Sequence, residues 1–116
     1  MKKSLTLFAL LITSALFLSA QVQHGIQLNW TQSITPGITH NAVYTSPTKG
    51  GPYTLLFTST TPITTYLVPQ TTTNQGTFAC FVVTATAIIE SSYSNETCST
   101  FPVSPIPPSG LSSGVV

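Results

Sequence analysis

One segment, residues 77–100, constrains the fold of this chain most, because it alternates apolar and polar side chains and holds both cysteines. Phe81, Val83 and Ala85 share one face of a period-2 pattern, which is typical of a strand half-buried in a sheet. The midpoint between Cys80 and Cys98 is residue 89, inside a short connector over residues 87–92. The segment therefore predicts an antiparallel hairpin in which the two cysteines face each other.

The first twenty residues have the layout of a secretory signal peptide. Two lysines precede an apolar run over residues 5–18, and the small Ala20 ends the segment. A transmembrane anchor is the alternative, but the run is short for a bilayer and is interrupted by Thr13 and Ser14. We expect cleavage after Ala20, secretion of the mature domain and no membrane insertion after cleavage.

Both cysteines lie in the part of the chain that would be exported, where an even pair predicts a disulfide. Closing a loop of this length contributes roughly 3 kcal/mol in the chain-entropy estimate. A reactive or metal-bound thiol is the alternative, and it is disfavoured because neither cysteine has a charged activator near it in sequence.

Charged side chains are almost absent beyond residue 20, where Lys49, Glu90 and Glu96 are the only ones. Threonine supplies much of the polar surface, and its branched Cβ suits strands, so the composition indicates an all-β fold. A single lysine provides no basic footprint for nucleic acid, and we expect no nucleic-acid partner. So little charge also gives little protection against self-association.

Short alternating segments separated by Gly/Pro/Asn-rich loops predict about six strands in an antiparallel sandwich. In the first of them, Trp30 is expected in the core, whereas the pattern around Val43 and Tyr44 leaves open which of the two faces inward. Prolines at high density from Pro102 onward disfavour a central strand. The predicted organisation is a domain over 21–103 and a Pro/Ser/Gly-rich tail or linker over 104–116. The expected strands lie near residues 26–30, 39–46, 52–60, 64–68, 77–85 and 93–100.

The order of IQLNW, VYTSPTKGGPYTLL, the Leu67–Pro69 pair, FVVTA and ESSYSNE resembles fibronectin type III domains of secreted bacterial proteins. The resemblance implies a seven-strand antiparallel Greek-key β-sandwich of the immunoglobulin-like class, with Trp30 on the second strand. It covers about residues 22–103, and PPSGL in the tail resembles the start of a following repeat. A bond between Cys80 and Cys98 would then join neighbouring strands on an outer face.

Three positions depart from the family pattern. The corner tyrosine of the sixth strand falls at Ala79, and Asn41 stands where an aromatic residue is common. Ile88 and Ile89 occupy the shortened connector between the last two strands, where polar residues are the norm.

Residues that could support catalysis or bind a metal are few. Glu90 and Glu96 are the only carboxylates, and nothing in their surroundings predicts the burial that separates a general acid from a base. His24 and His40 have no ligand-type residue at helical or strand spacing. We therefore expect a non-enzymatic protein without a cofactor or a metal.

Two tripeptides match the N-glycosylation pattern, at Asn29 inside an expected strand and at Asn95 near the end of a connector. Asn95 is the better placed candidate. A leader that begins Met-Lys-Lys resembles bacterial ones, for which this modification is uncommon.

By the topology that the resemblance implies, loops 31–38 and 87–92 should lie at one end of the sandwich, where rigid scaffolds usually present binding residues. The candidates for partner binding are Ile34, Thr35, Ile88 and Ile89. Two alternatives remain for the last two: an exposed apolar contact, or burial of a shortened turn under the sandwich.

The expected function is a secreted, non-enzymatic binding, adhesion or spacer module that contacts protein or carbohydrate at the cell surface. The alternative is a structural subunit of a self-assembling extracellular filament or surface layer. In that case the Pro-rich tail would add as an extended segment to the sheet edge of a neighbour.

Overall fold

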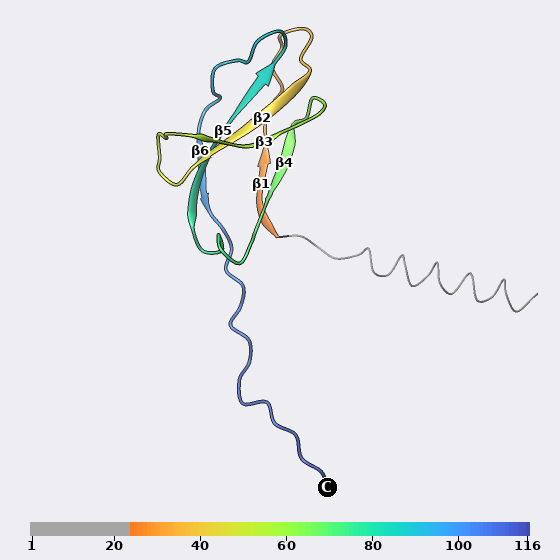
Figure 1. The fold of residues 1–116 in the computed structure, drawn as a ribbon, viewed down its shortest axis with the longest axis vertical. Helices are drawn as coiled ribbons and strands as arrows, with labels where there is room; N and C mark the ends of the chain where they lie inside the picture. The colour runs from red at the N-terminus through yellow and green to blue at the C-terminus, as the bar shows by residue number, and fades with distance from the viewer. Residues whose placement is uncertain (1–23) are drawn as a thin grey trace, which may run out of the picture.

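The computed structural model describes residues 24–116, which form an all-β domain followed by an extended tail (Figure 1). The predicted all-β class is confirmed, with six strands and no helix in the described part. The predicted signal peptide, residues 1–20, lies outside the described residues, and a seventh strand stays a prediction. The strands are β1 (Gly25–Asn29), β2 (His40–Ser46), β3 (Thr54–Thr58), β4 (Thr65–Pro69), β5 (Phe78–Thr86) and β6 (Thr97–Thr100).

The strands form two antiparallel sheets in a sandwich-like arrangement. One sheet pairs β1 with β4, and the other has the order β3-β2-β5-β6. The chain passes from β3 to β4 in the other sheet and then returns to β5, which pairs with β2. Strands distant in sequence are thus neighbours, and each sheet supplies one wall of the core.

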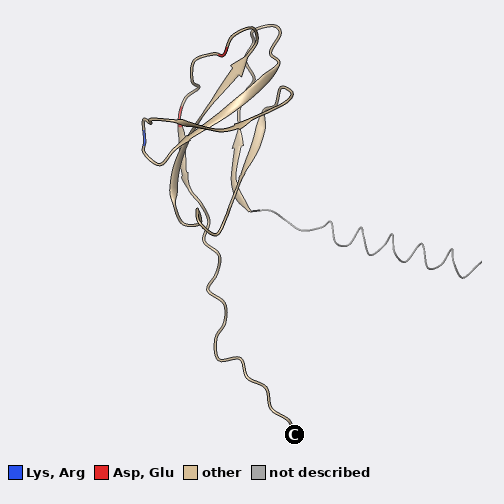
Figure 2. Ribbon diagram, viewed as in Figure 1, with Lys and Arg blue, Asp and Glu red and all other residues tan. Residues whose placement is uncertain are grey.

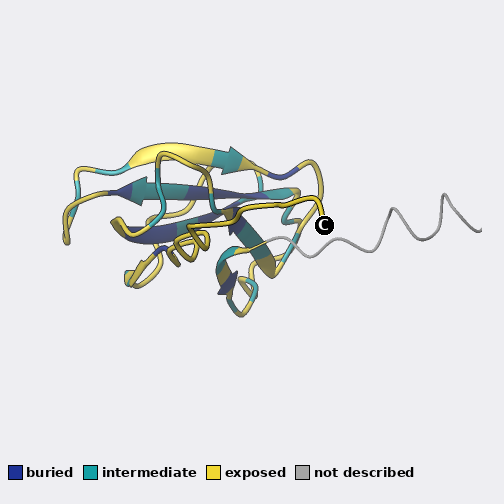
Figure 3. Ribbon diagram, turned by 90° about the horizontal axis from the view of Figure 1, so that it is seen from below, coloured by how far each residue is buried: buried dark blue, intermediate teal, exposed yellow. Residues whose placement is uncertain are grey.

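The hydrophobic core contains residues of both sheets (Figure 3). Val43 is completely buried in it, so Val43 faces inward and Tyr44, its neighbour in β2, faces the opposite side. Trp30 follows β1 and is only partly buried, packing against the cluster rather than inside it. The fully packed members are Leu28, Val43, Val68, Ala79, Phe81 and Phe101.

Strand β5 is buried on both faces, so the half-buried strand expected from its alternation is wrong. Phe81 points into the core, while Cys80, Val82 and Thr84 on the other face are also buried. Paired residues of neighbouring strands share a face, and Tyr44 is paired with Val82. The aromatic ring of Tyr44 and the residues packed on it therefore lie over this outer face.

Asn41 of β2 is a buried polar residue whose side chain connects three segments. Its Oδ1 accepts hydrogen bonds from the Gln32 amide at 2.8 Å and from the backbone N–H of Ile63 at 3.0 Å. Its Nδ2 donates to the Thr84 carbonyl at 3.1 Å and to Gln32 at 3.0 Å. Because a buried amide must have its bonds satisfied, this network fixes how two interstrand loops meet β5.

One lateral side of the domain is closed by aromatic stacking. Phe57 of β3 and Tyr66 of β4 lie parallel, with ring centroids 4.2 Å apart. These two strands belong to different sheets, so the stack joins the sheets where their edges meet. Both rings also pack against the core cluster.

The predicted turn at Lys49, Gly50 and Gly51 connects β2 to β3. Gly50 and Gly51 have φ values of 89° and 91°, which only glycine adopts without strain. This explains why two glycines follow Lys49 at the reversal.

The tail leaves the domain as an extended segment with no strand or helix over 102–116 (Figure 1). Its base is attached at Ser104, whose Oγ accepts a bond from the Gln70 amide at 3.2 Å. The Ser104 N–H donates to Gln75 Oε1 at 3.0 Å. Beyond this point the residues are exposed. Residues 24–116 also contain no helix suited to crossing a membrane.

Candidate binding surfaces

The two loops predicted to lie at one end of the domain are brought together there (Figure 1). Thr39, which ends the β1–β2 loop, donates from its N–H to the Thr86 carbonyl at 2.8 Å and from its hydroxyl to the same oxygen at 3.1 Å. Thr86 is the last residue of β5 and begins the connector to β6. Loops 31–38 and 87–92 therefore project from the same end of the scaffold.

Three isoleucines on these loops are exposed. Ile34 is 98% exposed, Ile88 99% and Ile89 80%, so the two residues of the connector are not tucked under the sandwich. A bridge between Thr86 and Glu90 holds the turn that presents them. Thr35 is exposed beside Ile34. Partner binding by these four residues stays a prediction. Their exposure leaves their side chains accessible to a partner.

Cys80 and Cys98 form the predicted disulfide. They are directly paired in the β5–β6 ladder, on the face of β5 opposite Phe81. The Glu96 carboxylate lies near them, with all three potential metal-ligand atoms within 4.8 Å of one another. Because the sulfurs are bonded to each other, neither offers the thiolate that a metal requires.

A cluster of aromatic and acidic side chains covers the outer face of the four-stranded sheet. We call it the tyrosine–glutamate cluster. Tyr93, from the β5–β6 connector, packs edge-on against Tyr44 at 5.2 Å and against Tyr53 at 5.3 Å between ring centroids. Its members are Tyr44, Tyr53, Tyr93, Glu90 and Glu96.

Each glutamate of the cluster accepts hydrogen bonds from a tyrosine and from a second donor. Glu90 accepts from the Tyr44 hydroxyl at 2.5 Å and from Thr84 Oγ1 at 2.7 Å. Glu96 accepts from the Tyr53 hydroxyl and from the backbone N–H of Gly50 at 2.7 Å. The connector is thereby attached to β2 and to the β2–β3 turn.

These bonds shift the pKa of both partners in each pair. The hydrogen bond from Tyr44, with that from Thr84, lowers the pKa of Glu90, and the bond from Tyr53 lowers the pKa of Glu96. The bond to Glu90, with burial, raises the pKa of Tyr44 from 10.0 to about 12, and the pKa of Tyr53 is raised by its bond to Glu96. At neutral pH the carboxylates are ionised acceptors and the tyrosines are neutral donors.

The cluster contains two of the three charged side chains among residues 24–116 (Figure 2). The third, Lys49, lies on the β2–β3 turn and helps to lower the pKa of Glu96. The rest of the described surface is uncharged, so specific contacts there depend on hydrogen bonds and apolar burial.

Sequence reasoning missed this cluster because its members are far apart in the chain, from Tyr44 to Glu96. Tyr44 was an undecided position in an alternating pattern, and Glu90 and Glu96 were considered only as a catalytic pair. The available signal was the position of Tyr93 between the two glutamates, in a connector that must fold over a neighbouring strand.

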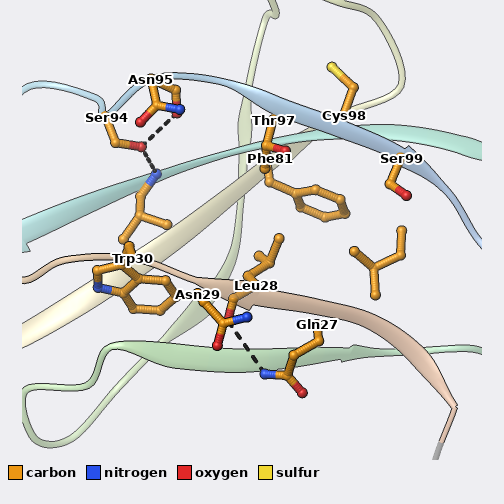
Figure 4. A pocket seen from close by; sticks show the side chains of 12 residues that line it. Gln27, Leu28, Asn29, Trp30, Phe81, Ser94, Asn95, Thr97, Cys98 and Ser99 are labelled. Atoms are coloured by element: carbon orange, nitrogen blue, oxygen red, sulfur yellow. Dashed lines mark hydrogen bonds between the residues drawn. The ribbon is translucent and has the colours of Figure 1, made fainter.

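The side of the domain opposite the Phe57–Tyr66 stack carries a groove between β1 and β6 (Figure 4). Its volume is about 460 Å³, and we call it the edge groove. Leu28 and Phe81 reach it from the core, Thr97 and Ser99 line it from β6, and the Cys98 side chain points away. A second hollow of about 440 Å³ shares Trp30 and further residues with it and continues toward the β1–β2 loop.

Trp30 lines both hollows, and its indole Nε1 is buried without a hydrogen-bond partner among the described residues. Asn95, the predicted glycosylation site, is exposed and lines the rim of both hollows. A glycan at Asn95 stays a prediction.

Comparison of the chain with known protein families, with curated proteins and with solved structures finds no match.

Proposed function

We propose that this protein is a secreted, non-enzymatic binding module that contacts a protein or a carbohydrate at the cell exterior through its loop end. The exposure of Ile34, Ile88 and Ile89 supports this best. Three large apolar side chains presented by two neighbouring loops of a rigid scaffold are typical of an interaction site.

We further propose that the domain is of the fibronectin type III kind. Two antiparallel sheets, with β4 and β5 connected across them and β5 returning beside β2, support a Greek-key sandwich. Trp30 packs against the core at the end of β1, the first strand among residues 24–116, where the resemblance implies the second strand. The seventh strand of that family has no counterpart among residues 24–116.

Two features support secretion. The disulfide between Cys80 and Cys98 suits an oxidising compartment. The layout of residues 1–20 suits a signal peptide.

The chemistry of the two carboxylates supports a non-enzymatic role. A general acid needs a carboxyl whose pKa is raised toward neutrality, whereas hydrogen bonds lower the pKa of both Glu90 and Glu96. Each is also already bonded to a tyrosine.

Retention of labelled protein on the cells that produce it tests the proposal. The triple variant Ile34→Ser, Ile88→Ser, Ile89→Ser should lose at least about tenfold in apparent affinity, since it removes the apolar contact. The matched control is Leu55→Ser, which removes an exposed apolar side chain on β3, away from the loop end.

Equal retention of the triple variant and the control would contradict the loop end as the binding site. Hydrolysis of an ester, glycan or peptide panel that disappears in Glu90→Gln would contradict the non-enzymatic role.

A second candidate function is that of a subunit of an extracellular assembly. The observation that favours it is the edge groove. The groove lies beside β1, one edge of which has no partner strand among residues 24–116, and the same chain carries an exposed, extended tail.

A further inference from the structure

One edge of β1 has no partner strand among residues 24–116, and the hydrogen bonds at its other edge show which backbone groups are left unpaired. At the two ends of the β1–β4 ladder, the Gln70 N–H donates to the His24 carbonyl at 2.8 Å and the Trp30 N–H to the Thr64 carbonyl at 2.9 Å. Hydrogen bonding alternates from residue to residue along an antiparallel ladder. The backbone N–H and C=O groups of the even-numbered residues of β1 therefore point toward β4. No strand within 24–116 pairs with the other edge of β1. The groups at that edge belong to Gly25, Gln27 and Asn29.

The edge groove beside these groups has an apolar floor. Leu28 and Phe81 are members of the core cluster, yet both line the groove, and Trp30 lies at its end (Figure 4). A strand laid in the groove would cover apolar surface and supply backbone carbonyls to the free donors.

The tail has the side chains that such a strand needs. Leu111 and Val115 are exposed, lie on one face of an extended chain and are separated by Ser113. No charged side chain occurs over 102–116, so inserting the tail into the groove desolvates no charged side chain. An eight-residue strand over 109–116 is about 26 Å long, which is longer than the five-residue β1 at about 17 Å.

The geometry of the tail favours a second copy of the chain over the copy that carries it. Ser104 is held at the base of the domain, and three prolines occur in 105–108. Prolines at this density favour a stiff polyproline conformation of about 3.1 Å per residue, which directs the chain about 12 Å outward. The following segment thus lies away from its own β1 edge and is free to reach the edge of another molecule.

We propose that residues 109–116 of one copy add as a strand to the free edge of β1 in a second copy, with Leu111 and Val115 over Leu28 and Phe81. This site rests on the second candidate function, self-assembly, and is independent of the loop end. Since the donating and accepting surfaces differ, the contact is head-to-tail and joins several subunits into an open chain or a closed ring.

The role of the tail is tested with two double variants that place the same charges on opposite faces of the same extended segment. Leu111→Asp with Val115→Asp places two charges on the face that enters the groove. The control, Ser112→Asp with Val116→Asp, adds the same charge to the same segment on the opposite face. In sedimentation of the full chain over a range of concentrations, the first variant should be monomeric, and the control should assemble as the unaltered chain does.

The groove side is tested with Gln27→Pro, which removes an N–H from the free edge and none from the β1–β4 ladder. Alone it should be monomeric, although its tail is intact. Mixed in equal amounts with Leu111→Asp/Val115→Asp, it should form a dimer and nothing larger, because only one working tail and one working groove remain. Trp30 is the only tryptophan, and its fluorescence should change when the groove is filled.

Each outcome decides one way. If the unaltered chain is monomeric at every concentration, both self-assembly and this site are wrong, and a monomer with protected β1 amides would mean that the tail folds back on its own domain. If the chain assembles but the two double variants behave alike, self-assembly stands and this site is wrong. The proposal is supported if Gln27→Pro and Leu111→Asp/Val115→Asp are each monomeric alone and form a dimer when they are mixed.

Discussion

The two lateral sides of this domain differ in how the sheets meet. On the β3–β4 side, the Phe57–Tyr66 stack joins the sheets, and Asn41, which also lines the second hollow, bonds the β3–β4 loop through the Ile63 N–H. On the β1–β6 side, the same core reaches the edge groove, where Trp30 has a buried indole N–H without a partner. We call these the closed side and the open side.

The difference indicates that the closed side mainly stabilises the domain, whereas the open side offers a surface for interaction. On the closed side, the buried Asn41 side chain has hydrogen-bond partners, and the two partly buried aromatic rings stack on each other. The open side leaves the donors at the edge of β1 without a partner strand among residues 24–116, beside a groove that reaches down to the core. An unpaired strand edge of this kind favours the binding of a further strand.

Replacing Asn41 with Leu should have the largest effect, because it breaks the closed side from within. The Ile63 N–H and the Thr84 carbonyl would lose their partners in a buried site, at a cost of about 4 kcal/mol in the free energy of unfolding. Urea unfolding measures this loss.

Asn29→Leu is the control for Asn41, since Asn29 is an exposed amide on β1. Its loss should be within about 0.5 kcal/mol, as for most surface substitutions. Equal losses at the two positions would show that the hydrogen bonds of Asn41 do not carry the stability of the closed side.

The sequence was sufficient for the elements that depend on local alternation and turn chemistry. The hairpin register of Cys80 and Cys98 was correct, and the glycines after Lys49 marked a turn, whereas Trp30, expected in the core, is only partly buried against it. The role of Asn41 was not predictable, because its partners come from two loops and another strand. It appeared only as a departure from an expected aromatic position.

Removal of the disulfide should have the next largest effect and acts on the open side. Strand β6 has only four residues, and Cys98 joins it to β5 across a separation of 18 residues. Cys80→Ala with Cys98→Ala should cost roughly 3 kcal/mol, mainly through the entropy of the unfolded chain. The unaltered protein unfolded in urea with a reducing agent should show the same loss, and a double variant as stable as the disulfide form would refute this role.

The candidate site was less predictable than the fold. The exposure of Ile88 and Ile89 was one of two open alternatives, because sequence does not say how a short connector leaves its strand. The tyrosine–glutamate cluster depends on the path of residues 87–96 over the sheet. The expected half-buried β5 failed for the same reason, since this connector brings Tyr93 over its outer face.

Raising the pH should weaken the outer face by a smaller amount. Tyr44 has a pKa of 10.0 when unfolded and about 12 in the folded protein, so its contribution is fully present below pH 10 and is lost as the pH rises through 12. Allowing for solvent screening, we expect about 1–2 kcal/mol. Denaturation at a series of alkaline pH values measures the loss, and phenolate absorbance follows the titration.

Glu90→Gln is the matched variant for Tyr44, because the amide oxygen still accepts the hydroxyl bond while the charge is removed. The pKa of Tyr44 should fall back toward 10, and the alkaline loss of stability should shrink. An unchanged Tyr44 titration in this variant would show that Glu90 does not cause the shift.

The smallest effect should come from Gln27→Pro on the open side. This variant tests directly whether the edge of β1 on that side is unpaired in the monomer. The Gln27 N–H points to the free edge, so proline removes no bond of the β1–β4 ladder, in contrast to a proline in a central strand. The amide side chain does bond to Thr65 Oγ1 at 2.5 Å, and Gln27→Ala isolates that contribution. Under conditions in which the chain is monomeric, both variants should lose no more than about 1 kcal/mol in urea unfolding. A loss of several kcal/mol for proline, with little for alanine, would mean that the Gln27 N–H is already bonded in the monomer and that this edge of β1 is not free.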